Sequence, residues 1–257
     1  MDETLELNRL AGRAVAAIIA GSPGREVRLT PNCALALSGE AVADLNMLLI
    51  GPDAEAERFL GDAMARVAER TLPLLVLMTP HVAGALTPVA QRLGLTPAGA
   101  IPLMRLRAET PVRLGGACEV ERADDQRTIG IGGDLAAAAF DLPRAAVART
   151  LEASLAERAG VEAFIGSSQG APMSAVTVTR AGQAAGVWNM STPPQHQRKG
   201  MGRALLTRVI DRYRRAGVGR FYLFATAAGR GLYESIGFET IADYPVWVLG
   251  HSTQVSA

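Results

Sequence analysis

The sequence predicts an α/β protein with a mixed central sheet, organised as two halves of similar build. Short β-rich runs alternate with amphipathic helical segments along its 257 residues. The most apolar run, residues 72–78, has the length and composition of a strand buried on both faces. In each half the predicted order is strand, helix, strand, helix ending at glycine, and strand.

The first half begins with a helix over residues 3–20, because apolar residues recur there at helical intervals and Gly-Ser-Pro-Gly at 21–24 ends it. Strands are expected near 26–30, 33–38, 43–50, 72–78 and 101–106, with helices at 54–70 and 82–93. Residues 108–116 have the composition of a connector. We therefore expect one domain at 1–112 and a second at 113–257.

The second half is predicted to begin with one strand and a pair of helices, followed by three successive strands. Strands are expected at 117–122, 162–167, 172–180, 183–190, 219–225 and 243–249, and helices at 134–140, 143–158, 200–215 and 228–235. Asp141 is the expected N-cap of the helix at 143–158, with Pro143 just inside it.

The two halves share residues at a constant spacing of 143 positions. The pairs are Asn46 with Asn189, Gly94 with Gly237 and Pro102 with Pro245. Together with the matching order of elements, this spacing predicts an internal duplication.

The charge balance and the cysteine content exclude several classes of protein. Twenty-six basic and 25 acidic residues leave a net charge of +1, which predicts neither a nucleic-acid nor a membrane partner. Cys33 and Cys118 lie far apart without a metal-ligand spacing, so we expect no structural disulfide or metal. The acidic start, interrupted by charges, does not fit a secretory signal, and we expect a cytoplasmic protein.

The stretch 191–206 has the pattern of an anion-binding turn. A β run ends there, prolines keep the chain extended, and Gly200 and Gly202 open a series of helix formers. Backbone N–H groups at a helix start converge on one point and carry the positive end of the helix dipole, and glycine lets an anion approach closely. Positive charge is added by Arg198, Lys199 and Arg203. We expect a diphosphate to bind at this turn.

Two motifs in the second half resemble those of the GNAT family of N-acetyltransferases. Residues 197–202 (Gln-Arg-Lys-Gly-Met-Gly) match the pattern Q/R-x-x-G-x-G/A at a strand-to-helix turn. Residues 232–238 (Leu-Tyr-Glu-Ser-Ile-Gly-Phe) are similar to the later family motif at the expected distance. The resemblance covers about 114–257 and implies the acyl-CoA N-acyltransferase fold.

The resemblance also implies roles for individual residues, with acetyl-CoA as cosubstrate and an amine as acceptor. The strand end that would pair with the pantetheine arm comprises Trp188, Asn189, Met190, Ser191 and Thr192. The turn that would hold the pyrophosphate comprises Gln197, Arg198, Lys199, Gly200, Met201, Gly202 and Arg203. Tyr233 would donate a proton to the departing thiolate, and Thr226 stands where the family usually has an asparagine that contacts the cofactor.

The sequence departs from the family at the general base. Many members carry a glutamate on the strand before the turn, where this chain has Trp188 and Asn189. A base must come from elsewhere, and Glu119, Glu121, Asp134, Glu162 or a water chain remain open. The expected acceptor is a small amine rather than a protein, since no strongly charged docking surface is evident; a homodimer stays open.

The first half lacks the corresponding residues. At the spacing of 143, residues 54–59 (Ala-Glu-Ala-Glu-Arg-Phe) stand where the second half has its turn, and Ala90 stands where it has Tyr233. Two carboxylates without a glycine would repel a diphosphate. We therefore expect the first half to be a degenerate GNAT-like copy that serves as scaffold, acceptor wall or dimer surface.

The sequence also allows two other functions and contains one further glycine-rich motif. The missing strand glutamate favours an acyl-CoA-binding sensor without turnover. Residues 166–170 (Gly-Ser-Ser-Gln-Gly) fit the nucleophile elbow of a serine hydrolase that would use Ser168 with His251, but the β run after it predicts a hairpin turn. Residues 130–133 (Gly-Ile-Gly-Gly) resemble a nucleotide-binding loop but lack its third glycine at the required spacing, so they predict a flexible loop. The resemblance to the GNAT family implies that this region borders the acceptor entrance, where it would suit a lid.

Overall fold

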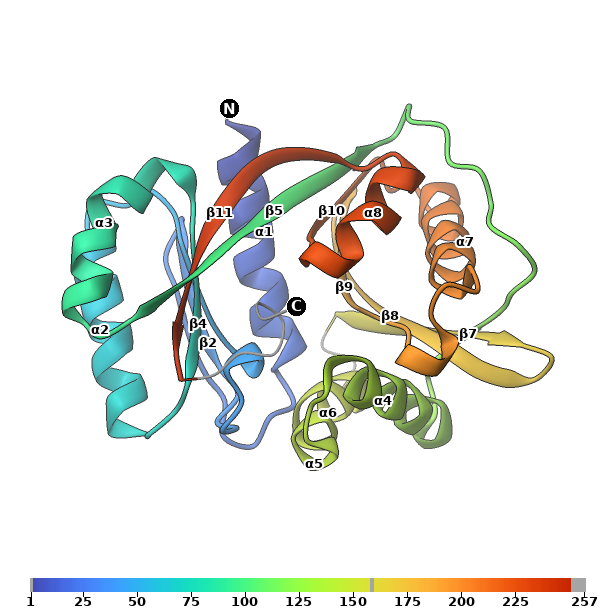
Figure 1. Cartoon of the computed structure of the whole chain (residues 1–257), viewed down its shortest axis with the longest axis horizontal. Helices are drawn as coiled ribbons and strands as arrows, with labels where there is room; N and C mark the ends of the chain where they lie inside the picture. The colour runs from blue at the N-terminus through green and yellow to red at the C-terminus, as the bar shows by residue number, and fades with distance from the viewer. Residues whose placement is uncertain (1, 158–159, 251–257) are drawn as a thin grey trace.

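The computed structural model describes residues 2–157 and 160–250, and it shows an α/β fold built on one continuous mixed sheet (Figure 1). In the described part of the chain the sheet has 11 strands in the order β1-β2-β3-β4-β11-β5-β10-β9-β8-β7-β6. The pairs β3–β4 and β9–β10 are parallel, and the other neighbours are antiparallel. The mixed central sheet predicted from the sequence is confirmed.

The elements of the first half follow the predicted order. Its strands are β1 (Glu26–Leu29), β2 (Cys33–Leu37), β3 (Asn46–Ile50), β4 (Leu74–Met78) and β5 (Thr96–Arg107). Its helices are α1 (Glu3–Ile18), α2 (Ala56–Glu69) and α3 (Pro80–Arg92), with a 3₁₀ turn at Ala43–Leu45.

The second half contains six strands and five α-helices in its described part. The strands are β6 (Glu119–Arg122), β7 (Val161–Ser168), β8 (Ala171–Ala181), β9 (Ala184–Ser191), β10 (Arg220–Phe224) and β11 (Glu239–Leu249). The helices are α4 (Gln126–Phe140), α5 (Arg144–Val147), α6 (Ala153–Ala156), α7 (Met201–Arg215) and α8 (Ala227–Ile236). A π-helical turn at Ala148–Glu152 joins α5 to α6, and a 3₁₀ turn occupies Pro194–His196.

The two halves exchange their last strands. Strand β5, which ends the first half, pairs with β10 of the second half, and β11, which ends the second half, pairs with β4 of the first. The two exchanged strands also pair with each other, and they cross the middle of the molecule in Figure 1. Each half of the sheet is thus completed by the other half of the chain, so a division of the chain near residue 112 does not separate two closed sheets.

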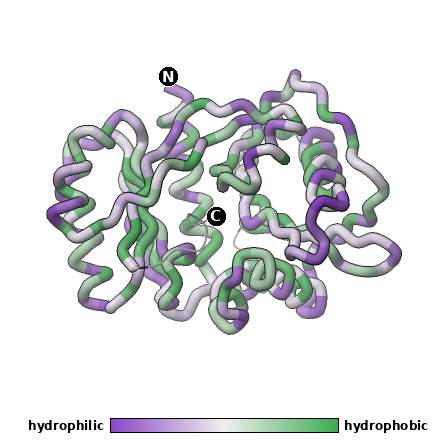
Figure 2. The backbone as a smooth tube through the Cα atoms, viewed as in Figure 1, coloured by the Kyte–Doolittle hydropathy of each residue, from purple (hydrophilic) through white to green (hydrophobic). Residues whose placement is uncertain are grey.

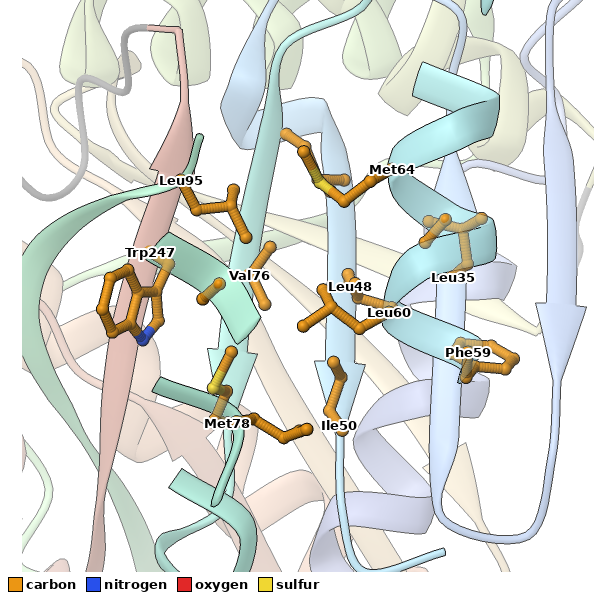
Figure 3. Close-up of a cluster of buried hydrophobic side chains, with 14 of the residues drawn as sticks. Leu35, Leu48, Ile50, Phe59, Leu60, Met64, Val76, Met78, Leu95 and Trp247 are labelled. Atoms are coloured by element: carbon orange, nitrogen blue, oxygen red, sulfur yellow. The ribbon is translucent and has the colours of Figure 1, made fainter. Parts of the chain in front are cut away.

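Helices cover both faces of each half of the sheet. In the first half, α2 and α3 pack on one face of β2–β4 through an apolar cluster that includes Leu48, Leu60 and Val76 (Figure 3). Helix α1 packs on the other face through Leu7, Ala11 and Val15. The strands between these layers are predominantly hydrophobic along their length (Figure 2), as expected for strands buried on both sides.

In the second half, α7 and α8 cover one face and α4–α6 the other. Leu205, Leu206 and Ile210 of α7 are fully buried against the strands, in the same cluster as Phe164 and Phe221. Burying a leucine or isoleucine side chain contributes about 1.5–3 kcal/mol, so this face anchors the start of α7 on the sheet.

Helix α4 begins eight residues earlier than the pattern predicted, so the interpretation of residues 130–133 as a flexible lid is wrong. A capping box starts the helix: the Thr128 N–H donates to Asp125 Oδ1 (2.7 Å), and the Thr128 hydroxyl lies 3.3 Å from the Asp125 N–H. Gly133 has a packing role, because a Cβ there would lie 1.7 Å from Glu152 Oε1.

Asp141 does not begin a helix, contrary to the prediction. It is the C-cap of α4, in the left-handed conformation with φ of 51°, and its N–H donates to the carbonyl of Ala137. Pro143 takes the N-cap position of α5. The error has a simple cause: aspartate is favoured at N-caps but also tolerates the left-handed conformation that commonly ends a helix.

The hairpin predicted at residues 166–170 is confirmed. Ser168 pairs with Ala171 across the β7–β8 turn, and both turn residues, Gln169 and Gly170, have positive φ, as a type I′ turn requires. No helix follows Ser168, so the geometry of a nucleophile elbow is not formed. His251, its suggested partner, lies outside the described residues.

Candidate active site

A cavity of about 800 Å³ lies where the two halves meet. The second half contributes the end of β9, the turn before α7, and α8. The first half contributes α1 and residues of β2, β3, β4 and β5. The cavity is therefore a joint product of both halves.

Strands β9 and β10 separate at this cavity. Their parallel ladder runs only from the Ala184–Arg220 pair to the Gly186–Tyr222 pair. Val187, Trp188 and Asn189 follow directly on β9 and line the cavity. Because β10 no longer pairs with them, the backbone groups on this side of β9 are positioned to pair with an extended ligand.

A β-bulge distorts the same part of β9. The register against β8 shifts between the Ala175–Ser191 and Thr177–Trp188 pairs, and Asn189 has a φ of 47°. The Asn189 Nδ2 atom is buried and has no hydrogen-bond partner among the described residues. A buried donor without a partner costs about 1–3 kcal/mol, and Asn189 is one of the residues that line the cavity.

The turn between β9 and α7 presents backbone N–H groups to the cavity. Gly200 is the N-cap of α7 with a φ of 76°, and no side chain caps this helix start. Gly200, Met201 and Gly202 line the cavity. The N–H groups of the first helical turn and the positive end of the helix dipole are thus directed to a place that a ligand can reach.

Side-chain hydrogen bonds hold the turn in shape. Gln197 Nε2 donates to the carbonyl of Thr192 (3.0 Å), and Lys199 Nζ donates to the carbonyl of Gln195 (2.8 Å). Arg203 Nη1 donates to the carbonyl (2.8 Å) and hydroxyl (2.7 Å) of Ser235, which links α7 to α8.

Gly202 is needed for close packing at this turn. A Cβ at Gly202 would lie 3.2 Å from Thr192 Oγ1 and 3.3 Å from Met190 Cε. A side chain at Gly200, in contrast, would meet nothing within 4 Å and would extend into open space. The two glycines of the motif therefore serve different purposes, one for packing and one for backbone conformation.

Tyr233 lies on α8 and lines the cavity, although its side chain is almost fully buried, at 8% exposed. Its ring contacts Phe238 edge to face, with centroids 5.8 Å apart. Burial raises the pKa of the Tyr233 phenol well above its ordinary value. The phenol therefore keeps its proton across the physiological pH range and can act as an acid.

Thr226 caps the helix that carries Tyr233. Its hydroxyl accepts a hydrogen bond from the Gly229 N–H (3.2 Å), and the residue also lines the cavity. The hydroxyl contributes to placing α8.

The structure brings together most of the residues singled out in the sequence. Those that line the cavity are Trp188, Asn189, Met190, Thr192, Gln197, Arg198, Gly200, Met201, Gly202, Arg203, Thr226 and Tyr233. Ser191 and Lys199 do not line it: the Ser191 hydroxyl faces β8 and donates to the carbonyl of Ala175 (3.3 Å). The Lys199 ammonium remains at the surface of the turn.

The carboxylates considered as bases lie elsewhere. Glu162 bonds to the Tyr213 hydroxyl and pairs with Arg122 (2.9 Å), and Asp134 pairs with Arg144 (2.5 Å). Neither these two residues nor the β6 glutamates at 119 and 121 are among those that line the cavity.

Two carboxylates do line the cavity, and sequence reasoning missed both. Asp44 comes from the turn before β3, and Asp141 ends α4. No motif marks Asp44, since it reaches the cavity from the other half of the chain. Asp141 was noticed only as a helix cap. Among the described residues, no group of histidine, cysteine, aspartate or glutamate side chains could hold a metal ion.

A known family model matches part of the second half. Residues 160–240 match the family model described as Acetyltransferase (GNAT) domain. A 55-residue segment, 20% of this chain, is 42% identical to the [ribosomal protein bS18]-alanine N-acetyltransferase of Escherichia coli K12, and an equal match is found in Shigella flexneri. The match spans only 37% of the length of these relatives.

Comparison with solved structures covers nearly the whole chain. A GCN5-related N-acetyltransferase from Kribbella flavida superposes with a TM-score of 0.68, at 18% identity over 96% of this chain and 98% of that one. A tandem GNAT protein from the clavulanic acid biosynthesis pathway superposes with a TM-score of 0.58, at 14% identity over 97% and 94%. At these identities the comparisons show the GNAT fold, and they extend it across both halves.

The described residues include no helix that is long and apolar enough to cross a bilayer.

Proposed function

Residues 160–240 of this chain are a GNAT acetyltransferase domain, and on that premise we propose that the protein transfers the acetyl group of acetyl-CoA to a primary amine. The observation that carries the proposal is the meeting of three features in one cavity. These are the opened strand β9, the uncapped start of α7, and the buried phenol of Tyr233.

The residues present fit acetyl-CoA. The pantetheine arm has amide groups that can pair with the free side of β9 between Val187 and Ser191, where Asn189 Nδ2 supplies a further unpartnered donor. The diphosphate suits the N–H groups at Gly200–Gly202, with Arg198 and Arg203 beside them. Each charge-assisted hydrogen bond to the diphosphate contributes about 1.5–3 kcal/mol.

Acetyl-CoA supplies a thioester, whose carbonyl carbon is attacked by the neutral amine while the carbon–sulfur bond breaks. Tyr233 is assigned the proton donor to the sulfur that leaves, because its phenol is neutral and lies in the same cavity. The amine releases one proton to solvent and Tyr233 regains one from solvent, so protons balance over the reaction and the phenol is restored. General-acid catalysis of this kind contributes a factor of about 10²–10⁴ in rate.

The first half is assigned the acceptor wall. We infer that residues 1–112 are a degenerate duplicate of the GNAT-like domain at 113–257 and bind no cofactor themselves. Supporting this, β3 and β4 pair without a gap from Met47–Leu75 to Ile50–Met78, and α2 starts beside Glu55 and Glu57. The first half instead contributes side chains to the cavity of the second.

An acyl-CoA-binding sensor is the second candidate. The observation that favours it is the end of β9, where Trp188 and Asn189 replace the glutamate that serves as base in many GNAT enzymes. A sensor retains CoA affinity without turnover, so affinity and turnover must be measured separately.

The deciding experiment combines calorimetric titration of acetyl-CoA with an assay for free thiol in the presence of a panel of amines. An enzyme binds acetyl-CoA and releases thiol only when an acceptor amine is present. In that case Tyr233→Phe lowers turnover about 100-fold or more while CoA affinity changes less than threefold. Binding without thiol release from any amine supports the sensor, and absence of binding contradicts both.

A further inference from the structure

We infer that the acceptor is a hydrophobic monoamine, held with its hydrocarbon part against the first half and its ammonium group near Asp141. This inference rests on the proposed acetyltransferase function and specifies its substrate class. It is drawn from the part of the cavity that the acetyl-CoA residues do not occupy.

The part of the cavity formed by the first half is apolar. Its lining side chains come from α1, β2, β3, β4 and β5 and include Val15, Ile18, Met47, Leu75, Leu77 and Ile101. Asp44 is the polar residue that this half adds to the described lining. A wall of this kind favours a hydrocarbon chain or ring over a sugar, because the hydroxyl groups of a sugar would lose their hydrogen bonds to water without gaining partners.

Basic and acidic residues of the cavity lining come from different segments. The described basic residues, His196, Arg198 and Arg203, lie in the segment between β9 and α7 or at the start of α7. The described carboxylates, Asp44 and Asp141, come from other segments. Val42, two residues before Asp44, packs against the apolar cluster that includes Leu142, the residue after Asp141. The carboxylate of Asp141 therefore favours a cationic acceptor over an acidic one.

Asp141 stands where helix stability favours another residue. It takes the left-handed conformation, with φ of 51° and ψ of 44°, which glycine or asparagine adopts more readily. It also places a negative charge at the C-terminal end of α4, where the helix dipole is already negative. A carboxylate that stability does not explain, at the edge of a cavity, is consistent with a role in binding.

The ammonium group suits the proposed chemistry. Asp141 binds the protonated form, which is the abundant form of an alkyl amine at neutral pH. The proton must then leave before attack on the thioester. We assign Asp141 to binding and orientation of the acceptor and leave the proton transfer to a group or water closer to the thioester.

The first test measures amine binding directly by calorimetry on the full-length protein without acetyl-CoA. Phenethylamine is expected to bind at least about tenfold more tightly than its neutral analogue 2-phenylethanol, through a charge-assisted contact that the alcohol lacks. Asp141→Asn is expected to remove this difference without lowering the melting temperature. Asp124→Asn makes the same charge change just before α4, outside the cavity lining, and should preserve the difference.

The second test measures thiol release with acetyl-CoA and four acceptors: phenethylamine, glucosamine, phenylalanine and a peptide with N-terminal alanine. The inference predicts the highest kcat/KM for phenethylamine. Asp141→Asn should raise its KM about 10- to 100-fold with little change in kcat or in CoA affinity. Met47→Gln, which places an amide on the apolar wall, should raise the same KM severalfold.

The outcomes separate the two proposals. Failure of acetyl-CoA to bind contradicts the acetyltransferase function, whatever the amine titration shows. If acetyl-CoA binds and thiol is released fastest with glucosamine or the peptide, the function stands and the hydrophobic acceptor is wrong. An unchanged preference for phenethylamine over 2-phenylethanol in Asp141→Asn would also overturn the inference.

Discussion

Two places in the molecule have the same local plan and different outcomes. In the first half, α2 connects the parallel strands β3 and β4. In the second half, α7 connects the parallel strands β9 and β10. The β3–β4 ladder continues over four residue pairs, from Met47–Leu75 to Ile50–Met78, whereas the β9–β10 ladder ends at Gly186–Tyr222 after three. The proposed cofactor site therefore lies where β9 parts from β10 and bulges against β8, and the order of elements that the two halves share does not produce this opening in the first half.

The asparagines at the matched positions show how the strands come to differ. Asn46 is fully buried and uses its whole amide: Oδ1 accepts from the N–H of Ser38 (2.9 Å), and Nδ2 donates to the carbonyls of Glu40 (2.7 Å) and Val42 (3.0 Å). Asn189 has a positive φ and a buried Nδ2 without a partner in the described structure. Asn46 stabilises the loop at 38–42 through its hydrogen bonds, whereas Asn189 keeps an amide donor without a protein partner in the described structure.

The helix starts differ in charge and in conformation. Gly200 begins α7 with positive φ, and Glu55 occupies the corresponding cap of α2 without a side-chain cap. Glu57, the residue at the spacing of 143, is also acidic. Whether α2 and α7 are aligned by their N-caps or by the spacing of 143, a glutamate of the first half stands where the second half has Gly200.

The largest expected effect on CoA affinity comes from placing at position 200 the glutamate that the first half has at the corresponding position. Gly200→Glu should lower CoA affinity more than 100-fold, because a carboxylate would face the diphosphate. The fold should persist: a Cβ at Gly200 meets nothing within 4 Å, and the left-handed conformation costs about 1 kcal/mol. Calorimetry and thermal melting check the two parts of this prediction.

Gly200→Asn is the matched control, since asparagine tolerates the same conformation and carries no charge. It should retain CoA affinity within about tenfold. Unchanged affinity in Gly200→Glu would mean that the diphosphate does not bind at this turn.

The two asparagines should respond in opposite ways to replacement by alanine. Asn46→Ala leaves buried groups of the 38–42 loop without partners, and should lower the free energy of unfolding by about 3 kcal/mol without changing CoA affinity per folded molecule. Asn189→Ala removes an unpartnered donor and should lower CoA affinity about three- to tenfold with little loss of stability. Urea unfolding and calorimetry on both variants measure the four quantities, and equal effects of the two changes would contradict the comparison.

Alkaline pH should destabilise the protein through the second half. All four tyrosines lie there, and burial raises the pKa of Tyr213, Tyr222, Tyr233 and Tyr244 above the ordinary value of about 10. Above pH 10 the unfolded chain releases these protons while the folded chain keeps them, so the free energy of unfolding falls as pH rises. Each tyrosine contributes a slope of up to about 1.4 kcal/mol per pH unit.

Tyr233→Phe should make the free energy of unfolding fall less steeply with pH, by up to about 1.4 kcal/mol per pH unit, which is the contribution of one tyrosine. Urea unfolding at pH values between 9 and about 11 gives the slope for the wild type and the variant. Equal slopes would show that Tyr233 ionises as readily in the folded protein as in the unfolded chain, which would remove the basis for treating it as a retained acid.

The smallest expected effect is in the first half. Glu55→Ala and Glu57→Ala should leave CoA affinity unchanged within error, because neither residue lines the cavity and both are exposed on α2. Calorimetric titration with acetyl-CoA measures this directly. A change of more than threefold in either variant would contradict the assignment of the first half as a part without a cofactor.

The elements and the turn before α7 were predictable because their signals are local. The β7–β8 hairpin and the helix after Gly200 follow from residues close together in the chain, whereas Tyr233 was found through the resemblance of residues 232–238 to a family motif. The start of α4 was missed although its capping box, Asp125 with Thr128, was present in the sequence. Three glycines at 130–133 suggested a loop, and the close approach of Gly133 to Glu152 that explains one of them spans 19 positions.

The sequence by itself determined the order of strands and helices and the glycine-rich turn, since each depends on the conformational preferences of neighbouring residues. Only the tertiary structure decided that β5 and β11 change places, that β9 parts from β10 beyond Gly186, and that Asp44 and Asp141 border one cavity. These features depend on which distant segments pack together. Strand pairing and cavity lining are set by contacts between residues far apart in the chain, from 36 positions for Gly186 and Tyr222 to 113 for Arg107 and Arg220, and no local pattern records them.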